Sequence, residues 1–211
     1  MITLYFHPLS FPALTTLFTA QAAGVDYESV VIDLATGEHK KPEFLAINPF
    51  GRVPALTHGD YKLAESSAII RYIAKLGKSS LYPDDAKTQG TIDQWSDFVV
   101  HHVRTNVARV QFNRVLAPMF GMEPDKASLA MGLKFLEGSL PIVEARLSDS
   151  PFLAGDSITL ADMSLIAALE PAKMAGLDME PYPKLMKWLT ARRSETFYTN
   201  VHSHFGAELG M

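Results

Sequence analysis

The hydrophobic pattern of this chain changes its period once, and that change limits the folds open to it more than any other feature. In the first eighty residues, short runs rich in β-branched and aromatic residues alternate with stretches of helical period. After the linker-like segment Tyr82–Asp85 the strand signals stop, and apolar residues recur at helical spacing. The sequence therefore predicts an α/β domain over residues 1–80 and an all-α domain over residues 86–211.

The first domain is expected to have the element order βαβαββα. Gly24 and Gly77 follow the two longer helical stretches, at the position where glycine commonly ends a helix. The segment His58–Asp60 separates two short strands and predicts a hairpin turn. The expected elements are strands over residues 2–6, 27–33, 53–57 and 61–63, and helices over residues 11–23, 42–47 and 65–76.

The second domain begins with a long apolar stripe at helical spacing that includes Ile92, and Pro118 is expected to end this helix. A second long helix is expected over residues 126–147. Thr159 and Asp162 then form a capping box that starts a further helix. Because a carboxylate at a helix N-terminus already has a structural reason to be there, we assign Asp162 a folding role and no catalytic one.

Charge and composition narrow the classes of partner. The 211 residues carry a formal charge of −4 with acidic and basic residues interspersed, so the chain lacks a basic footprint for nucleic acid or anionic membranes. No apolar run approaches the ~20 residues that a membrane-spanning helix needs. The first residues read as a strand and not as a charged signal-peptide start. We therefore expect a cytoplasmic protein that binds neither nucleic acid nor membrane.

The chain contains no cysteine, which excludes disulfides, thiolate metal sites and Cys-X-X-Cys redox chemistry together. Any sulfur nucleophile must come from a ligand. The seven histidines lack the spacing of known zinc sites, and the adjacent His101 and His102 diverge on a helix. We therefore expect no metal site.

Four short motifs in the first domain, each weak alone, occur in the order found in one enzyme family. They are Tyr5-Phe6-His7-Pro8-Leu9-Ser10, Glu38-His39-Lys40-Lys41-Pro42-Glu43-Phe44-Leu45, Asn48-Pro49-Phe50-Gly51-Arg52-Val53-Pro54-Ala55-Leu56 and Glu65-Ser66-Ser67-Ala68-Ile69. With the capping box and the helical second half, the chain resembles the glutathione transferases, most of all the phi and theta-like branch that uses a serine hydroxyl. The resemblance implies a thioredoxin-like first domain, and glutathione as a co-substrate with no permanently bound cofactor.

The resemblance implies that glutathione is held at two places in the first domain. Val53 and Pro54 open a strand, and the family implies a cis peptide bond between them, although sequence alone favours trans. Their backbone would then pair with the tripeptide as an added strand. Glu65 and Ser66 stand at a helix start and suit the ammonium and carboxylate groups of the γ-glutamyl end, with ordinary first-turn capping as the alternative.

The glycine end of glutathione is assigned to basic residues. His39 and Lys40 resemble the positive contacts that the family makes with this carboxylate, with a solvated loop pair as the alternative. Arg52 departs from the family, which commonly has glutamine or lysine beside the Val-Pro bond. We include Arg52 because a longer cation still reaches a carboxylate.

Two hydroxyls are candidates for ionising the thiol of glutathione. Ser10 follows the first strand at the opening of the first helix and is our choice; its alternative role is an N-cap. Tyr5 lies in the strand, at the place used by tyrosine-type relatives, and its alternative role is a core aromatic residue. A hydroxyl bonded to a charged group contributes ~1.5–3 kcal/mol and a helix N-terminus ~0.3–2 kcal/mol, enough to lower a thiol pKa by about two units without a histidine base.

The electrophile is expected to be hydrophobic, because the residues assigned to its pocket are apolar. Core packing is the alternative role for each of them. The assigned residues are Leu9, Phe11, Leu34, Phe112, Val115, Leu116 and Met119.

The expected activity is conjugation of glutathione to an electrophile, and peroxidase activity on organic hydroperoxides stays open. A thiol–disulfide oxidoreductase is excluded because the chain has no cysteine. A non-catalytic glutathione-binding or interaction module on the same fold is the alternative from another class. The resemblance also implies a homodimer, in which Phe50 would insert into the helical domain of the partner, with intrachain packing of Phe50 as the alternative.

Overall fold

The structure is a computed structural model that describes the backbone of residues 1–209 and the side chains of residues 1–203. By its internal contacts the chain forms two compact units. The first is Met1–Asp84 together with the segment from Arg193 onward, and the second is Asp85–Arg192. All strands of the described chain belong to the first unit, and the second is helical. The predicted fold class, α/β followed by all-α, is confirmed.

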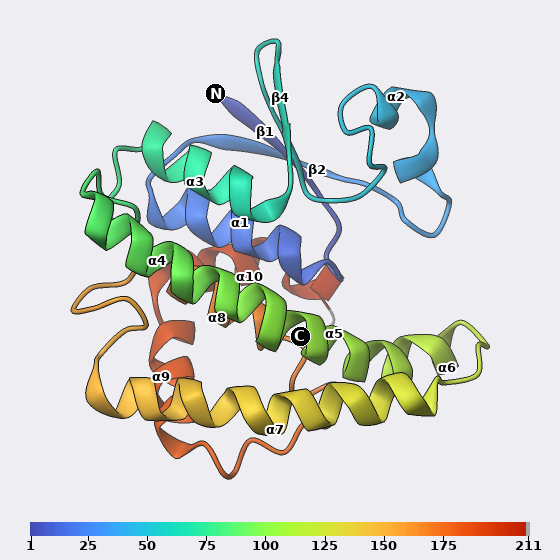
Figure 1. The fold of residues 1–211 in the computed structure, drawn as a ribbon. Coiled ribbons are helices and arrows are strands. Elements are labelled where there is room, and N and C mark those ends of the chain that lie inside the picture. The colour runs from blue at the N-terminus through green and yellow to red at the C-terminus, as the bar shows by residue number, and fades with distance from the viewer. Residues whose placement is uncertain (210–211) are drawn as a thin grey trace. The chain divides into compact units, whose positions relative to one another are not determined.

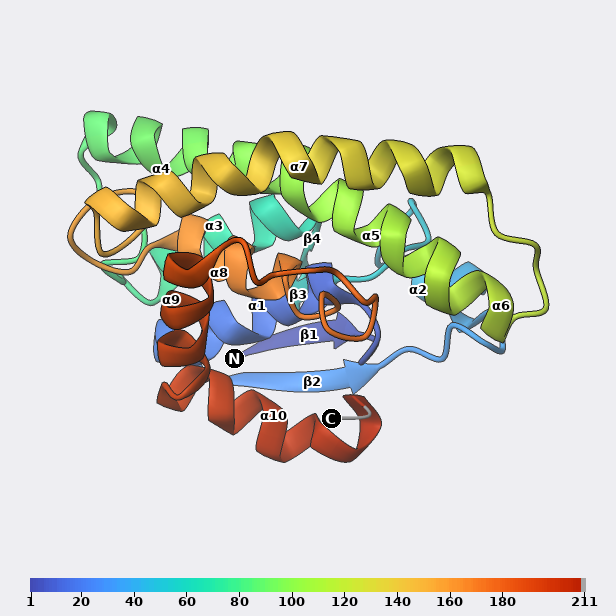
Figure 2. The same cartoon turned by 90° about the horizontal axis from the view of Figure 1, so that it is seen from below.

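The first unit is built on a four-stranded mixed sheet (Figure 1). Its strands are β1 (Ile2–Phe6), β2 (Tyr27–Val31), β3 (Ala55–His58) and β4 (Tyr61–Ala64), in the order β2-β1-β3-β4. Strands β1 and β2 run parallel, and their arrows point the same way in Figure 2. Strand β3 pairs antiparallel with both β1 and β4. Leu4, Phe6 and Leu56 are fully buried, as expected for the core-facing positions of β1 and β3.

Two helices of the first unit, α1 (Phe11–Ala22) and α3 (Ser66–Leu76), pack side by side on the same side of the sheet (Figure 1). Their C-terminal ends meet, because a Cβ added at Gly77 would lie 2.6 Å from the Ala23 carbonyl oxygen. Glycine is therefore needed for this close approach. A short 3-10 turn, η1 (Glu38–Lys40), and the short helix α2 (Pro42–Leu45) connect β2 to β3. The predicted order βαβαββα is confirmed.

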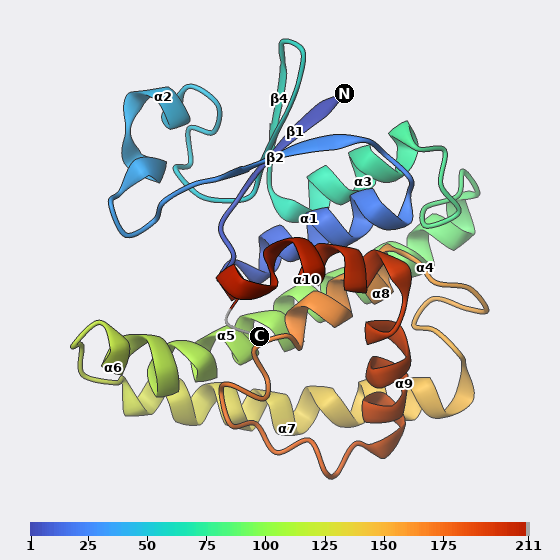
Figure 3. The same ribbon diagram turned by 180° about the vertical axis from the view of Figure 1, so that it is seen from behind.

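The last helix, α10 (Thr196–Leu209), packs on α1 within the first unit (Figure 3). The ring of Phe18 stacks on Tyr198 with ring centroids 5.3 Å apart and meets Phe197 edge-on at 6.0 Å. The sequence placed residues 86–211 in one helical domain, and the grouping of α10 with the sheet differs from that expectation. An apolar period identifies a helix but not the surface that the helix covers. The domain boundaries themselves stay a prediction.

The second unit begins with an unbroken run of helical segments from Ala86 to Met119. The segments are α4 (Ala86–Phe98), the π-helical η2 (Val99–Arg104), α5 (Thr105–Gln111), the π-helical η3 (Phe112–Leu116) and α6 (Ala117–Met119). The run ends at Met119, so the end predicted at Pro118 is correct to within one residue. Pro118 itself lies in the first turn of α6, where a missing N–H removes no bond of that segment.

The long helix α7 (Lys126–Asp149) runs antiparallel to this first run and contacts α5 and both π-helical turns (Figure 1). Asp125 caps it by accepting hydrogen bonds from the N–H groups of Ala127 and Ser128, at 2.9 and 3.0 Å. Pro141 lies inside the helix. The remaining helices of the described chain are α8 (Leu160–Ala168) and α9 (Pro183–Arg193). The predicted second long helix is therefore confirmed.

The capping box of α8 is confirmed. The carboxylate of Asp162 accepts hydrogen bonds from the N–H and the hydroxyl of Thr159, at 2.8 and 2.9 Å, and from the N–H of Leu153 at 3.0 Å. Asp162 is fully buried, as is every other residue of α8. Burial raises the pKa of Asp162 to about 6, and the three hydrogen bonds offset part of that rise.

We expect the contribution of Asp162 to the free energy of unfolding to fall as pH rises, because burial favours its neutral form. With an ordinary pKa of 3.8 and a folded pKa of about 6, this contribution is fully present below pH 3.8 and is lost as pH rises through 6. The shift corresponds to ~3 kcal/mol. Urea unfolding from pH 4 to 7 should therefore show wild type losing up to that amount relative to Asp162→Asn. A gain would mean that the hydrogen bonds outweigh burial.

Candidate functional site

One row of the sheet positions the candidate residues. Tyr5 pairs with Ala55, and Ala55 pairs with Ala64. Because β3 is antiparallel to both neighbours, the chain after Tyr5, before Ala55 and after Ala64 lies at the same end of the sheet. The predicted site residues in these segments are Ser10, Val53, Pro54, Glu65 and Ser66. The strand register therefore brings the predicted contacts for the thiol, the backbone and the γ-glutamyl group together.

Two helix N-termini lie at this same end. Helices α1 and α3 have 12 and 11 residues, and their C-terminal ends meet where Gly77 approaches Ala23. Because the two helices pack side by side, their first residues are also neighbours (Figure 1). Each N-terminus carries a partial positive charge and N–H groups without an intrahelical partner. This end of the first unit is therefore suited to negatively charged groups.

Ser10 occupies the N-cap position of α1, with φ −96° and ψ 93°. Its carbonyl accepts hydrogen bonds from the N–H groups of Ala13 and Leu14, at 2.8 and 3.1 Å. Its hydroxyl does not cap the helix, and it makes no hydrogen bond within the described residues. The side-chain capping role that we considered for Ser10 is therefore not adopted, and the hydroxyl can bond to a ligand.

Tyr5, the other candidate hydroxyl, lies in β1 with its ring against apolar side chains. It packs on the buried cluster of Ile32, Phe44 and Ala55, and its ring meets that of Phe44 edge-on at 6.1 Å. These contacts account for a tyrosine at this position as part of the core of the first unit.

The peptide bond between Val53 and Pro54 is cis, in agreement with the resemblance. Val53 lies just before β3, and its backbone N–H and C=O make no hydrogen bond within the part of the chain that the structure describes. An extended peptide can therefore pair with Val53 as an added strand.

Asn48 fixes the loop before Val53, a role that sequence reasoning missed. This buried side chain donates from Nδ2 to the Arg52 carbonyl at 2.6 Å and accepts at Oδ1 from the Phe50 N–H at 3.0 Å. Gly51 in the same turn has φ +57°, and an added Cβ would lie 3.0 Å from the His39 carbonyl oxygen. Asparagine followed by proline and then glycine is a turn signal, and asparagine closes such turns through its side chain. That signal could have identified Asn48.

The three basic residues expected at the glycine end lie around this turn. Lys40 Nζ donates to the Gly51 carbonyl at 2.8 Å, and a lysine ammonium has two further N–H donors. His39 Nδ1 is buried without a hydrogen-bond partner among the described residues. Arg52 is exposed. Around the same loop, the Lys40 ammonium is hydrogen-bonded, the His39 Nδ1 has no partner among the described residues, and the Arg52 guanidinium is exposed.

Glu65 is held in a backbone conformation that is rare for a residue with a side chain. It has φ 69° and ψ 116° and stands directly before α3. Its carbonyl accepts hydrogen bonds from the N–H groups of Ala68 and Ile69, each at 3.0 Å. Ser66, the first residue of α3, is only 6% exposed. Such strain is of order 1–3 kcal/mol and is concentrated at functional sites, so it supports a ligand contact at Glu65.

The residues predicted for the electrophile pocket are divided between the two units. Leu9, Phe11 and Leu34 belong to the first, and Phe112, Val115, Leu116 and Met119 to the second. Leu34 packs on the same apolar cluster as Tyr5, whereas Phe112 and Met119 are 41% and 62% exposed. The pocket itself stays a prediction.

No group of three or more His, Asp or Glu side chains among the described residues is arranged to hold a metal ion. Among the same residues, no helix has both the length and the apolar character that crossing a membrane requires.

The sheet, the helices on it and the helical second unit define a thioredoxin-like protein with a polar site at one end of the sheet. Family models agree with this class. The glutathione S-transferase N-terminal domain model matches residues 1–75, and the corresponding C-terminal domain model matches residues 107–194. The chain therefore belongs to the glutathione S-transferase family.

Several relatives with high similarity are plant proteins that carry the name glutathione S-transferase. "Glutathione S-transferase 3" of Zea mays is 38% identical over 82% of this chain and 79% of that protein. "Probable glutathione S-transferase GSTF2" of Oryza sativa subsp. japonica is 36% identical over 89% of each chain. The structure of maize glutathione S-transferase I in complex with an atrazine glutathione conjugate has a TM-score of 0.87 at 29% identity, over 99% of this chain and 98% of that one.

These similarities confirm the predicted resemblance to the phi branch. They support glutathione conjugation as the activity of the chain, with glutathione as co-substrate, and they do not favour the non-catalytic module.

We expect the two substitutions Glu65→Gly and Glu65→Ala to separate backbone strain from ligand contact. Glycine accepts a positive φ without strain, so Glu65→Gly should be more stable than Glu65→Ala by ~1 kcal/mol in urea unfolding. Both variants lack the carboxylate, so both should bind glutathione about tenfold more weakly in calorimetry. Equal stability would refute the strain, and unchanged affinity in both would refute the contact.

Proposed function

We propose that this chain binds glutathione at the end of the sheet where α1 and α3 begin, and that the Ser10 hydroxyl stabilises the glutathione thiolate. One observation carries the proposal. The Tyr5–Ala55–Ala64 register brings three groups to the same end of the sheet. They are a hydroxyl and a backbone segment that have no partner among the described residues, and a helix N-terminus. These are the groups that a thiolate, a peptide backbone and a carboxylate require.

In this proposal the tripeptide lies extended along Val53. The N–H and C=O of Val53, which have no partner among the residues that the structure describes, pair with its backbone. Ser66 and the N-terminus of α3 bind the γ-glutamyl carboxylate, and Glu65 binds the ammonium group. This arrangement gives the strained conformation of Glu65 a reason, because it directs one carboxylate to a ligand cation.

The glycine carboxylate is assigned to the loop that holds His39, Lys40 and Arg52. The buried Nδ1 of His39 lacks a partner among the described residues, and such a nitrogen costs ~1–3 kcal/mol while it stays unpaired. A carboxylate oxygen would satisfy it when the imidazole carries a proton there. Lys40 is already held by the Gly51 carbonyl at 2.8 Å, so its ammonium is positioned before the ligand arrives.

The proposed chemistry needs no general base. Lowering a thiol pKa from ~8.5 to ~6.5 raises the thiolate fraction at pH 7 from about 3% to about three-quarters, a change of ~2.7 kcal/mol. A hydrogen bond from Ser10 to a charged sulfur and the α1 N-terminus together supply that amount. The thiolate then attacks a hydrophobic electrophile at the predicted apolar pocket.

The proposal also includes a cytoplasmic location and a second activity, the reduction of organic hydroperoxides. Glutathione is kept as a free thiol in the cytoplasm, which supports a cytoplasmic location. Reduction of organic hydroperoxides would use the same thiolate, so parallel assays with an aryl halide and cumene hydroperoxide would give the balance of the two activities.

We expect Ser10, and not Tyr5, to set the ionisation of the bound thiol. In wild type the thiolate absorbance of bound glutathione should titrate about two pH units below that of free glutathione, and Ser10→Ala should reverse most of this shift with similar affinity. Tyr5→Phe keeps the ring in its apolar cluster and should change little. If Tyr5→Phe restores the ordinary thiol pKa and Ser10→Ala does not, the serine assignment is wrong.

We also propose that the chain forms a two-fold homodimer through Phe50. This side chain is 61% exposed, and Asn48 holds its turn through hydrogen bonds to Phe50 and Arg52. The helical unit of a second copy offers exposed apolar residues at helical spacing on α7, namely Met131, Phe135 and Ile142. A two-fold interface would use such a contact twice.

We expect sedimentation velocity to find a dimer of wild type at micromolar concentration and a monomer of Phe50→Asp, because a buried unpaired carboxylate opposes association. Val31→Ser removes another exposed apolar side chain, 43% exposed on β2, and serves as the control that should remain dimeric. A monomeric wild type would contradict the dimer, and a dimeric Phe50→Asp would contradict this contact.

A further inference from the structure

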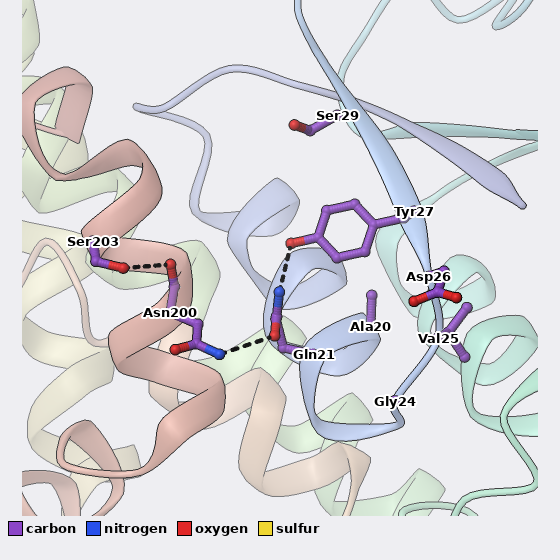
Figure 4. Close-up of a pocket in the computed structure, with 9 residues that line it drawn as sticks. All are labelled: Ala20, Gln21, Gly24, Val25, Asp26, Tyr27, Ser29, Asn200 and Ser203. Atoms are coloured by element: carbon purple, nitrogen blue, oxygen red, sulfur yellow. Dashed lines mark hydrogen bonds between the residues drawn. The ribbon is translucent and has the colours of Figure 1, made fainter.

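A second polar pocket lies in the first unit, away from the residues assigned to glutathione (Figure 4). Its volume is about 520 Å³, within the range of roughly 300–1,000 Å³ that is typical of small-molecule sites. Its walls come from the C-terminal part of α1 and the turn after it, from β2, and from α10. The lining residues are Ala20, Gln21, Gly24, Val25, Asp26, Tyr27, Ser29, Asn200 and Ser203.

A chain of hydrogen bonds joins the three walls. Gln21 Nε2 donates to the Tyr27 hydroxyl at 3.3 Å, and Asn200 Nδ2 donates to Gln21 Oε1 at 3.4 Å. Ser203 Oγ donates to the Asn200 carbonyl at 3.0 Å. Figure 4 shows Gln21 at the centre, between Tyr27 of β2 and Asn200 of α10. The side chain of Gln21 is therefore fixed from both sides before any ligand binds.

Three residues that line the pocket, Tyr27, Ser29 and Asp26, can still form hydrogen bonds with a ligand. The Tyr27 oxygen accepts from Gln21, and within the described residues its O–H donates to no partner. Burial raises the pKa of Tyr27, so this O–H stays protonated in the physiological range. The Ser29 hydroxyl and the Asp26 carboxylate make no hydrogen bond with another described residue. The pocket thus presents donors and acceptors together.

The lining selects against two classes of ligand. It includes no Lys, Arg or His and carries the carboxylate of Asp26, so an anion would be repelled without compensation. A purely apolar ligand would cover the amides and hydroxyls of Gln21, Tyr27 and Ser29 without giving them partners. A neutral ligand with many hydroxyl groups satisfies both conditions, and the ring of Tyr27 adds a flat apolar surface for the C–H face of a sugar ring.

We propose that this pocket is a binding site for a neutral polyhydroxylated small molecule, of which an aromatic glycoside is the representative class. The site is separate from the glutathione contacts and does not depend on their assignment. Gln21, Tyr27 and Asn200 bind the hydroxyl groups, and Asp26 excludes anionic analogues.

The test uses the full chain with S-hexylglutathione present, so that the conjugation site is occupied. The probe is phenyl β-D-glucopyranoside, followed by calorimetry and by the side-chain amide signals of Gln21 and Asn200 in nuclear magnetic resonance. We expect saturable binding with a dissociation constant below ~1 mM, and shifts of both amide signals. Glucose 6-phosphate and 1-naphthol should bind at least about tenfold more weakly.

Three variants locate the binding. Tyr27→Phe and Asn200→Ala should each weaken the glucoside about threefold to tenfold, because each removes one hydrogen-bonding group. Glu28→Gln, an exposed change on β2 outside the lining, should leave affinity unchanged. Conjugation activity should persist in all three, which shows that they fold. No saturable binding, equal binding of the other two probes, or equal affinity in wild type and all three variants would overturn the proposal.

Discussion

The backbone pairing that aligns Tyr5, Ala55 and Ala64 is the constraint on which the proposed glutathione site depends. In the neighbouring row Leu4 pairs with Leu56, and both side chains are fully buried. A slip of one residue would turn these side chains out of the core, so burial of one row fixes the register. The same register sets where the chain leaves the sheet at Ser10, Val53 and Glu65. Apolar packing and site chemistry are thus coupled through strand pairing.

Electrostatics at that end follow from the two helices and need no buried base. Helices α1 and α3 pack side by side and meet at their C-terminal ends, so their N-termini are also neighbours. Each N-terminus offers N–H groups and a partial positive charge. A preorganised donor set stabilises negative charge without reorganising when the charge forms. The Ser10 hydroxyl, which has no partner within the described part of the chain, and the strained Glu65 both fit a site arranged before its ligand binds. The conformational strain lies in the backbone of Glu65, which has a positive φ. The hydrogen bonds from the N–H groups of Ala68 and Ile69 in α3 to the Glu65 carbonyl offset part of that strain.

Sequence patterns predicted the elements well where the signal was local. Runs rich in β-branched and aromatic residues predicted the strands, glycine predicted the ends of α1 and α3, and the capping box at Thr159 predicted the start of α8. Sequence patterns failed to predict contacts between segments that are far apart in the sequence. They did not show that α10 covers Phe18, because that contact depends on which groups meet in three dimensions. The role of Asn48 was missed for another reason, since a local turn signal marks it.

The length of α1 separates the two proposed sites. Ser10 and Gln21 mark opposite ends of α1, a helix of 12 residues, which spans about 18 Å at 1.5 Å per residue. A glycoside at Gln21 and glutathione at Ser10 therefore do not compete for space. Each could affect the other only by moving α1, whose Leu14 and Leu17 are fully buried. Coupling between two ligands is a reciprocal free energy. A closely packed α1 offers little freedom for one ligand to change, so this packing favours independent binding.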